Sequence, residues 1–495
     1  IARRVREQHV YSELMRYNTP ASELAKRAPA GIILSGGPSS VFEKGAPLCD
    51  PEIYNMNVPV LGICYGMQMT GMLLGGVVKP GKAREYGSAE IAVVDQQPLF
   101  KGLPSKLDVW MSHGDQVEKL PPGFHTMART TTCPNAAMGS KEKNIYGLQF
   151  HPEVVHTPQG TQILRHFLFD VCRCRGDWEM AQFVKESIES IRKTVGTDHV
   201  VCGLSGGVDS SVVAVLLHKA IGNQLHCIFV DNGLLRSNEA QQVEQTFGSA
   251  FRMDLHVCHS QELFLNKLKG ITDPEDKRKV IGKTFIDVFA EEARRLGDIK
   301  YLAQGTLYPD VIESFSPIGG PSATIKSHHN VGGLPDDLHF KLIEPVRELF
   351  KDEVRALGRE LGVPDHIINR QPFPGPGLAV RILGEVTAER VALLQKADLR
   401  VQEEIALLPN QHDIWQSFAV LLPIQSVGVM GDSRTYENVV ALRVVESRDG
   451  MTADWFHLPY DVLGKISNRI INEVRGVNRV VYDISSKPPA TIEWE

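Results

Sequence analysis

Short apolar runs alternate with longer amphipathic stretches over the first third of the chain. The runs AGIILSGG (30–37) and VPVLGICYG (58–66) predict strands, and MQMTGMLLGG (67–76) predicts a helix. The chain opens on IARRVREQ (1–8), which also has a helical pattern. Apolar strands alternating with helices are typical of a parallel sheet covered by helices. The pattern predicts a doubly wound α/β domain over residues 1–172.

The same alternation returns after a boundary. Two helical patterns, ended by Gly176 and Gly196, predict a domain junction near residue 176. Beyond it, strand patterns at 199–204 and 225–233 alternate with helical patterns at 211–220 and 278–297. We therefore expect a second doubly wound α/β domain over residues 176–370.

The last part of the chain has a different composition. QPFPGPG (371–377) is rich in prolines and glycines, which do not fit within a helix or a central strand. It therefore predicts a linker. After it, helical patterns at 386–408 and 461–476 alternate with strand patterns at 421–429, 438–447 and 478–485. This order predicts a small α+β domain over residues 371–495.

Composition narrows the class of protein. The 495 residues carry a formal net charge of -6, with 42% hydrophobic and 23% charged residues. No apolar run reaches the roughly 18 residues of a membrane span, so we expect a soluble protein with no membrane partner. The negative charge also disfavours nucleic acid as a partner. Eight scattered cysteines without a signal peptide fit a reducing compartment, and we expect the cytoplasm.

A cysteine stands at a predicted strand-to-helix corner. Cys64 lies between Gly62 and Gly66, in the glycine-x-nucleophile-x-glycine spacing of a nucleophile elbow. The helix dipole at such a position favours the thiolate, which is the reactive form. On this motif alone, a buried structural cysteine in a glycine-rich turn fits equally well.

A histidine and a glutamate supply partners for this cysteine. His151 and Glu153 flank Pro152 in IYGLQFHPEV, and the proline favours an extended chain that turns both side chains to one side. Glu153 can then orient the imidazole that acts as base for Cys64. We therefore predict a catalytic triad of Cys64, His151 and Glu153.

GICYGMQ and QFHPE, preceded by LSGGPSS, resemble the class I glutamine amidotransferases. The resemblance implies that the thiolate attacks the side-chain amide of glutamine and releases ammonia. It also implies an oxyanion hole of backbone N–H groups around Gly36, Gly37 and Tyr65. The family has a strand ahead of the helix that starts here at Ile1, and that strand is missing from this sequence.

A second glycine-rich loop, GLSGGVDSS (203–211), follows a strand pattern and precedes a helix pattern. Its N–H groups and hydroxyls converge where the helix dipole favours an anion, which predicts a phosphate site. It is not a Walker A loop, because the lysine of that motif is absent, and Lys277 stands where Gly282-Lys283-Thr284 would need a glycine.

The loop resembles the SGGxDS loop of the ATP pyrophosphatase (PP-loop) superfamily. The resemblance implies that the loop grips the pyrophosphate of ATP as the leaving group, and that AMP is transferred to an oxygen of the substrate. The carboxylate of Asp209 is suited to hold Mg²⁺ between the phosphates. The implied ATP-binding residues are Ser205, Gly206, Gly207, Val208, Asp209, Ser210, Ser211 and Lys326, with Asp310 and Glu313 near the phosphates.

The order of the two sites, with RQPFPGPGLAVR, LLPIQSVGVMGDSRTY and the terminal SKPPATIEWE, resembles the glutamine-hydrolysing GMP synthetase family over essentially the whole chain. The resemblance implies conversion of XMP, ATP and glutamine into GMP, AMP, pyrophosphate and glutamate. It implies XMP contacts by Arg278, Asp432, Lys487 and Glu493, and a homodimer formed through the last domain. The residues alone would also let SKPPATIEWE be a frayed tail.

Three alternatives compete with this interpretation. A tRNA-modifying PP-loop enzyme is disfavoured by the charge and by the absence of a long basic run. A PP-loop ligase that makes asparagine or NAD would not need the Cys64 and His151 motifs. A scaffold with lost catalytic function conflicts with the presence of every expected catalytic residue. Cys172 and Cys174 lack C-x-x-C spacing and are expected to be structural, without zinc.

Overall fold

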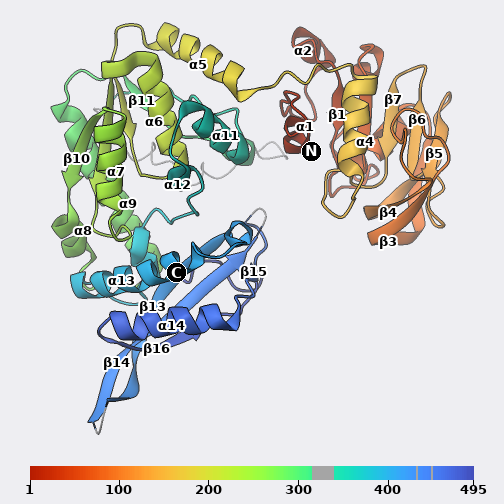
Figure 1. Ribbon diagram of the computed structural model, residues 1–495. Helices are drawn as coiled ribbons and strands as arrows, with labels where there is room; N and C mark the ends of the chain where they lie inside the picture. Colours follow the sequence, from red (N-terminus) through yellow and green to blue (C-terminus); the bar gives the residue numbers. More distant parts are fainter. Residues whose placement is uncertain (315–338, 431–432, 448–449) are drawn as a thin grey trace. The chain divides into compact units, whose positions relative to one another are not determined.

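The computed structural model describes residues 1–314, 339–430, 433–447 and 450–495. The chain forms two compact units, Ile1–Glu179 and Met180–Glu495. In Figure 1 the first unit is coloured red to yellow and the second runs from yellow to blue. Within the described ranges, no helix combines the length and apolar character needed to cross a membrane. The predicted division into three domains stays a prediction.

The first unit is built on a seven-stranded mixed sheet. In sheet order its strands are β1 (Ile32–Leu34), β2 (Val60–Ile63), β7 (Ile145–Leu148), β6 (Ala137–Ser140), β5 (His125–Arg129), β3 (Val77–Val93) and β4 (Lys106–Lys119). The neighbours β1, β2 and β7 are parallel, and the remaining pairs are antiparallel. The α/β class is confirmed. The antiparallel half was not foreseen from the alternation of strands and helices.

The helices of the first unit are α1 (Ala2–Arg6), α2 (Ala21–Lys26), η1 (Pro51–Asn55), α3 (Tyr65–Leu73), α4 (Gly160–His166) and η2 (Phe167–Val171). Both β2 and β7 are buried at every position, as expected of central strands covered on both faces. The single helix predicted over 161–174 is instead α4 followed by a π-helical turn, η2.

The second unit begins with α5 (Met180–Val195) and contains a five-stranded parallel sheet. In sheet order its strands are β10 (Asp254–His259), β9 (Leu225–Asp231), β8 (Val200–Gly203), β11 (Tyr301–Ala303) and β12 (Lys341–Ile343). From β8 the chain adds β9 and then β10 on one side of the sheet. It then returns to add β11 and β12 on the other side. The carboxyl ends of β8 and β11 therefore form the topological switch point, where open sheets of this kind bind ligands.

The helices around this sheet are α6 (Val208–Ile221), η3 (Gly222–Gln224), α7 (Glu239–Val243), η4 (Glu244–Ala250), α8 (Gln261–Leu268), α9 (Pro274–Arg295), α10 (Tyr308–Ser314), α11 (Lys351–Leu361) and α12 (Asp365–Ile368). Helix α9 begins before the helical pattern expected at 278–297, at a capped N-terminus. The carboxylate of Asp273 accepts hydrogen bonds of 3.0 Å from the N–H groups of Glu275 and Asp276, and Pro274 is the first helical residue.

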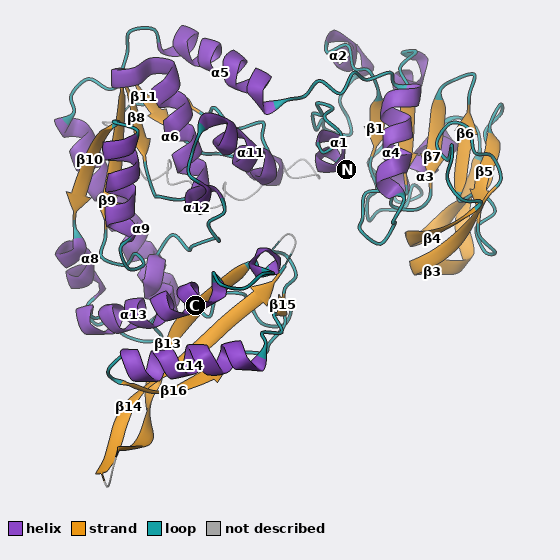
Figure 2. Cartoon of the chain, in the orientation of Figure 1, coloured by secondary structure: helices purple, strands orange, loops and turns teal. Residues whose placement is uncertain are grey.

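The last elements of the second unit form a small α+β layer, as predicted. They are η6 (Gly377–Arg381), α13 (Ala388–Ile405), η7 (Gln411–Asp413), β13 (Gln416–Met430), β14 (Ser433–Glu446), β15 (Asp454–Trp455), α14 (Tyr460–Glu473) and β16 (Val477–Tyr482). Strands β13 and β14 form a long antiparallel hairpin, which runs to the lower left of Figure 2. Buried residues of β8, β9, α13 and β14 belong to one hydrophobic core, so this layer packs directly against the five-stranded parallel sheet.

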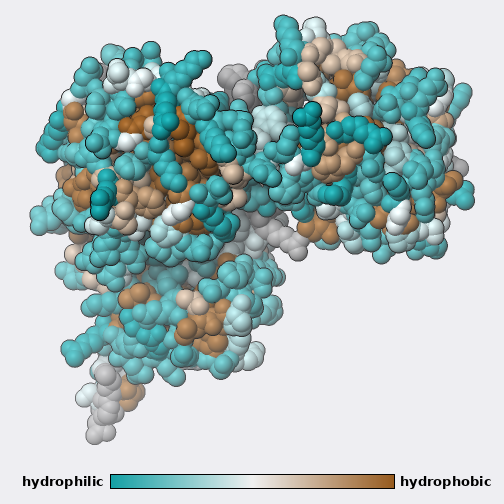
Figure 3. Space-filling model, turned by 45° about the horizontal axis from the view of Figure 1, so that its top comes forward, coloured by the Kyte–Doolittle hydropathy of each residue, from teal (hydrophilic) through white to brown (hydrophobic). Residues whose placement is uncertain are grey.

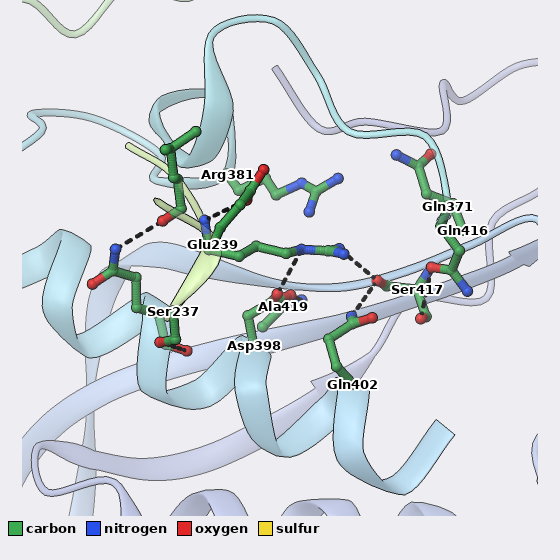
Figure 4. A network of polar contacts seen from close by, with 12 residues as sticks. Ser237, Glu239, Gln371, Arg381, Asp398, Gln402, Gln416, Ser417 and Ala419 are labelled. Carbon is green, nitrogen blue, oxygen red and sulfur yellow. Dashed lines mark hydrogen bonds and ion pairs between the residues drawn. The ribbon is translucent and has the colours of Figure 1, made fainter. Parts of the chain in front are cut away.

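A buried polar network joins the two layers of the second unit (Figure 4). Arg236, which follows β9, forms an ion pair of 3.0 Å with Asp398 of α13 and donates a hydrogen bond of 3.2 Å to the carbonyl oxygen of Ser417. Gln402 donates to the same oxygen at 2.7 Å. Because Asp398 is buried, its charge requires this partner, and the pair fixes how α13 and β13 meet the sheet.

Candidate functional site

Cys64 occupies the corner between β2 and α3. Its backbone has φ of 52° and ψ of -107°, a strained conformation for a residue with a side chain. The corner is tight: a Cβ on Gly66 would lie 2.2 Å from the carbonyl oxygen of Leu34, and a Cβ on Gly62 would lie 2.6 Å from the backbone of Gly66. Only glycine fits at these two positions, and their absence of side chains lets the chain turn sharply at Cys64.

His151 and Glu153 lie beside this cysteine, in the segment after β7. The imidazole Nδ1 of His151 is 2.8 Å from Oε1 of Glu153. A hydrogen bond with Cys64, and then the hydrogen bond with Glu153, raise the pKa of His151 to about 10, against the opposing effect of burial. The imidazole therefore holds a proton at neutral pH between the thiol group and the carboxylate.

The glutamate is held in its charged form. Burial on its own raises the pKa of Glu153, but the hydrogen bond and the charge of His151 outweigh it, and the net pKa lies below the ordinary value. The backbone of His151 is also fixed, because its N–H donates to the carbonyl oxygen of Trp110 at 3.0 Å and its carbonyl oxygen accepts from the hydroxyl of Thr157 at 2.7 Å. The triad geometry thus rests on β4 and on the turn before α4.

The residues predicted for the oxyanion hole border the triad. A Cβ on Gly36 would lie 3.0 Å from Cε1 of His151 and 3.5 Å from Cβ of Cys64. A Cβ on Gly37 would lie 3.9 Å from the ring of Tyr65, the first residue of α3. The structure therefore brings these three backbone segments together next to the thiol group.

Two buried glutamines near Cys64 were not predicted from the sequence. Gln149 donates through Nε2 to Sγ of Cys64 at 3.7 Å, and Gln68 donates to the carbonyl oxygen of Asp115 at 2.7 Å. Their spacing from the triad could have predicted them. Gln68 is one helical turn after Cys64, and Gln149 is two residues before His151 in an extended segment. At these spacings each glutamine lies on the same face of its element as a triad residue.

The second candidate site is the loop between β8 and α6. Gly206 has φ of 71°, and a Cβ there would lie 2.9 Å from a methyl group of Val243, so the position requires glycine. The hydroxyls of Ser205 and Ser210 are 2.9 Å apart, and Ser205 accepts from the N–H of Gly207 at 3.3 Å. Arg370 fixes the loop from outside by donating to the carbonyl oxygen of Gly206 at 2.8 Å.

The loop has a lysine partner from a distant part of the chain. Nζ of Lys351, the first residue of α11, lies 2.6 and 2.7 Å from the two carboxylate oxygens of Asp209. The two residues are 142 positions apart in sequence. Gly305, after β11, provides the space beside Asp209, since a Cβ there would lie 3.2 Å from its Cβ. The lysine that the loop sequence lacks is therefore supplied by another part of the chain.

The other residues predicted to bind ATP have varied surroundings. Val208 and Ser211 are buried in the first turn of α6. Asp310 accepts a hydrogen bond of 2.9 Å from the N–H of Leu307 and so caps α10. Lys326 and the side chain of Glu313 lie outside the described residues.

Two of the predicted XMP residues lie at the C-terminal segment, which is docked and not frayed. Arg278 donates to the carbonyl oxygen of Glu495 at 2.5 Å, and the fully buried Lys277 reaches the side chain of the same residue at 2.5 Å. Glu493 accepts from Arg381 at 2.8 and 3.1 Å. The segment is thus held by three cations, two of which, Lys277 and Arg381, form ion pairs with its carboxylates.

The remaining predicted XMP residues are placed apart from this cluster or outside the described chain. Lys487 donates through Nζ to the carbonyl oxygen of Gly450 at 2.7 Å. Asp432 lies outside the described residues. The fully buried Arg443 holds the segment around Lys487 by donating to the carbonyl oxygens of Ser485 and Thr491 at 2.7 and 3.1 Å.

Comparison with known proteins identifies the families to which three parts of the chain are similar. The family model for glutamine amidotransferase class-I matches residues 1–171, the one for NAD synthase matches 179–262, and the one for the GMP synthase C terminal domain matches 403–494. The first unit is therefore a class I glutamine amidotransferase, joined to a PP-loop nucleotide-binding sheet.

Similarity to individual proteins extends over the whole chain. A glutamine-hydrolyzing GMP synthase of Carboxydothermus hydrogenoformans is 58% identical over 495 residues, covering 100% of this chain and 97% of the relative. One of Caldanaerobacter subterraneus is 57% identical, with coverage of 100% and 96%. A solved structure of a GMP synthase subunit from Thermoplasma acidophilum is 34% identical, has a TM-score of 0.32 and covers 35% of this chain and 86% of that chain. The chain belongs to the glutamine-hydrolysing GMP synthase family, a family of ligases.

The contacts of Glu153 lead to a prediction about the charge of His151. In Glu153→Gln, the pKa of His151 should fall by about one unit or more, because the imidazolium loses an anionic partner. NMR titration of the histidine Cε1–H signals in the full chain would measure the shift, with the His151 signal assigned by its loss in His151→Gln. The exposed Glu142→Gln serves as control and should leave the titration unchanged. An equal pKa in Glu153→Gln would show that the carboxylate does not hold the proton.

The ion pair of Lys351 with Asp209 leads to a second prediction. Lys351→Met should raise the KM for ATP and lower GMP formation at least about tenfold, because the loop loses its nearest cation. The loss should be the same with glutamine and with ammonia, since the glutaminase site does not contain this lysine. Steady-state kinetics with Lys396→Met, an exposed lysine of α13, as control would test this. Unchanged ATP kinetics would contradict a role for Lys351 at the phosphates.

Proposed function

We propose that the two corners described above each perform one half of GMP synthesis. As a member of its family, the chain makes GMP from XMP, ATP and glutamine in purine biosynthesis. The first corner releases ammonia from glutamine, and the second transfers AMP from ATP to an oxygen of XMP that ammonia then replaces. The observation that carries the proposal is the hydrogen-bonded group of Cys64, His151 and Glu153 at a strained strand-to-helix corner.

At the first corner, the thiolate of Cys64 attacks the side-chain amide carbon of glutamine. The protonated His151 gives its proton to the departing nitrogen, which leaves as ammonia, and the enzyme retains a thioester. Water then hydrolyses the thioester to glutamate, with the neutral imidazole as base. Backbone N–H groups of Gly36, Gly37 and Tyr65 stabilise the oxyanion in both steps.

At the second corner, the loop from Ser205 to Ser211 binds the departing pyrophosphate through its N–H groups and hydroxyls. Lys351 supplies the positive charge that the loop sequence lacks. The carboxylate of Asp209 fits Mg²⁺, because it already faces a cation with both oxygens. Magnesium bound there with ATP would neutralise charge on the phosphates. We place Lys326 at the phosphates on the family resemblance alone.

We propose that the nucleotide XMP binds near the docked C-terminal segment. Arg278 and Glu493 both lie there, in a cluster that also includes Lys277 and Arg381. We propose that Arg278 and Lys487 bind anionic groups of XMP and that Glu493 and Asp432 accept from its base or ribose. The substrates are small molecules, and we expect no nucleic acid or membrane partner.

One substitution separates the two halves of the reaction. Cys64→Ala should lower glutamine-dependent GMP formation at least about a thousandfold while ammonia-dependent formation stays as in the wild type. Nucleotide analysis after incubation with Mg²⁺, ATP and XMP should give AMP and GMP. Cys174→Ala is the control, since Cys174 lies outside the site. Formation of ADP, or loss of both activities in Cys64→Ala, would refute the division of roles.

We also propose a homodimer that forms through the β13–β14 hairpin, in the cytoplasm. Val427, Val429 and Tyr436 are 50%, 75% and 63% exposed, and Val427 pairs with Tyr436 across the hairpin. Figure 3 shows hydrophobic residues at the lower left, on the described part of this hairpin. Exposed apolar side chains in such a row are typical of a surface covered by a partner. The cytoplasm fits the eight free cysteines.

The dimer proposal predicts the effect of charge on the hairpin. Val429→Lys combined with Tyr436→Lys should raise the dimer dissociation constant at least about tenfold, because two apolar anchors would become charged at the contact. Analytical ultracentrifugation over a range of concentrations measures this constant. Leu407→Lys, at a position that is 72% exposed outside the hairpin, is the matched control. Equal dissociation constants would rule out the hairpin as the interface.

A further inference from the structure

Three histidines and two carboxylates gather at the edge of the second sheet opposite the phosphate loop. His199 precedes β8, and His226 and Asp254 face each other in register near the starts of β9 and β10. His256 lies two residues further along β10, and Glu292 comes from the last turns of α9. The reaction proposed above uses none of these side chains.

The donor atoms of three residues in this histidine cluster lie close enough together to share one metal ion. Nδ1 of His226 lies 2.5 Å from one oxygen of Asp254, and Nε2 of His256 lies 3.2 Å from the other. One donor atom from each of the three residues lies within 4.8 Å of the other two. In a tetrahedral zinc site with bonds of about 2.0 to 2.1 Å, neighbouring donor atoms are about 3.3 Å apart. The pair formed by His256 and Asp254 already has this separation.

One ring nitrogen of His256 lacks a hydrogen-bond partner among the described residues. Its Nε2 is buried and has no hydrogen-bond partner in the described part of the chain, although Asp254 is close. Its Nδ1 lies 3.5 Å from Oε1 of Glu292. A neutral imidazole carries a single N–H, so one of its nitrogens presents a lone pair to a carboxylate oxygen. A cation bound at Nε2 removes this repulsion.

The remaining members of the cluster fit the surroundings of a bound metal ion. Nε2 of His226 is 2.8 Å from Nδ1 of His199, and the two rings stack at 5.0 Å. When His226 binds a metal through Nδ1, its Nε2–H donates to His199, the usual support of a metal-bound imidazole. Arg295 lies 3.3 Å from Glu292 and balances that carboxylate, whereas Asp254 forms its ion pairs with the cluster histidines themselves.

We propose that His226, Asp254 and His256 bind a divalent transition-metal ion of the zinc type, with water as the fourth ligand. Two imidazoles and one carboxylate select zinc over magnesium, which prefers oxygen ligands. The ion replaces the proton that His226 shares with Asp254, and that proton is released to solvent. The site joins the starts of β9 and β10 and stabilises this edge of the sheet. It takes no part in adenylylation.

Metal binding to the full chain tests this proposal. All proteins carry Cys64→Ala, so that the catalytic thiol does not bind metal, and are freed of metal with a chelator. Calorimetric titration with Zn²⁺ should give a site whose dissociation constant rises at least about tenfold in His256→Asn and in Asp254→Asn. Titration with Co²⁺ should give the visible absorption of a tetrahedral complex in the parent but not in these two variants. Zn²⁺ should also raise the melting temperature of the parent more than theirs.

His259→Asn is the control, because His259 lies on the same strand at its other end. It should keep the zinc affinity, the cobalt spectrum and the thermal shift of the parent. Ammonia-dependent GMP formation in every variant shows that the second unit is folded. If His256→Asn does not fold, Asp254→Asn, which keeps the side-chain shape, still tests the proposal. Zinc affinity equal in the parent and both ligand variants, or no tetrahedral cobalt spectrum in the parent, would overturn the proposal.

Discussion

Both reaction centres of this chain depend on backbone that turns from a parallel strand into a helix without room for side chains. At the first corner, the backbone at Gly62 and Gly66 passes so close to its neighbours that a single Cβ would overlap another carbonyl group. The consequence is chemical, because the turn holds Cys64 in an unfavourable backbone conformation at the start of α3, where its buried thiol group lies beside His151. At the second corner, Gly206 has φ of 71° and a Cβ there would lie 2.9 Å from a methyl group of Val243, so this turn also requires glycine.

Glycine makes these corners sharp, but other elements make them reactive. His151 reaches Cys64 because β7 lies next to β2 in the sheet, so the segments that follow the two strands leave the same edge. Lys351 reaches Asp209 because α11 packs against α6. In each case a parallel sheet places the ends of distant segments side by side, and the catalytic group is assembled from them.

The sequence predicted the elements well and the long-range contacts poorly. The apolar runs and glycines were sufficient to locate β2, β8 and their following helices, because those signals are local. The antiparallel half of the first sheet was missed, since β3 and β4 carry no local mark of strand direction. The partner of Asp209 was missed for a similar reason: nothing near Lys351 in the sequence says which loop it will meet. Asp432 and Lys326 stay predictions that rest on the family resemblance.

The missing lysine of the phosphate loop therefore has a physical explanation in two parts. A lysine inside the loop would be fixed beside the terminal phosphate, where γ-phosphoryl transfer needs it. Lys351 instead begins a separate helix, and its Nζ pairs with both carboxylate oxygens of Asp209 while the side chain stays 42% exposed. The packing of α11 against α6 therefore brings the positive charge to the loop, where it neutralises the carboxylate of Asp209 without occupying a position within the loop.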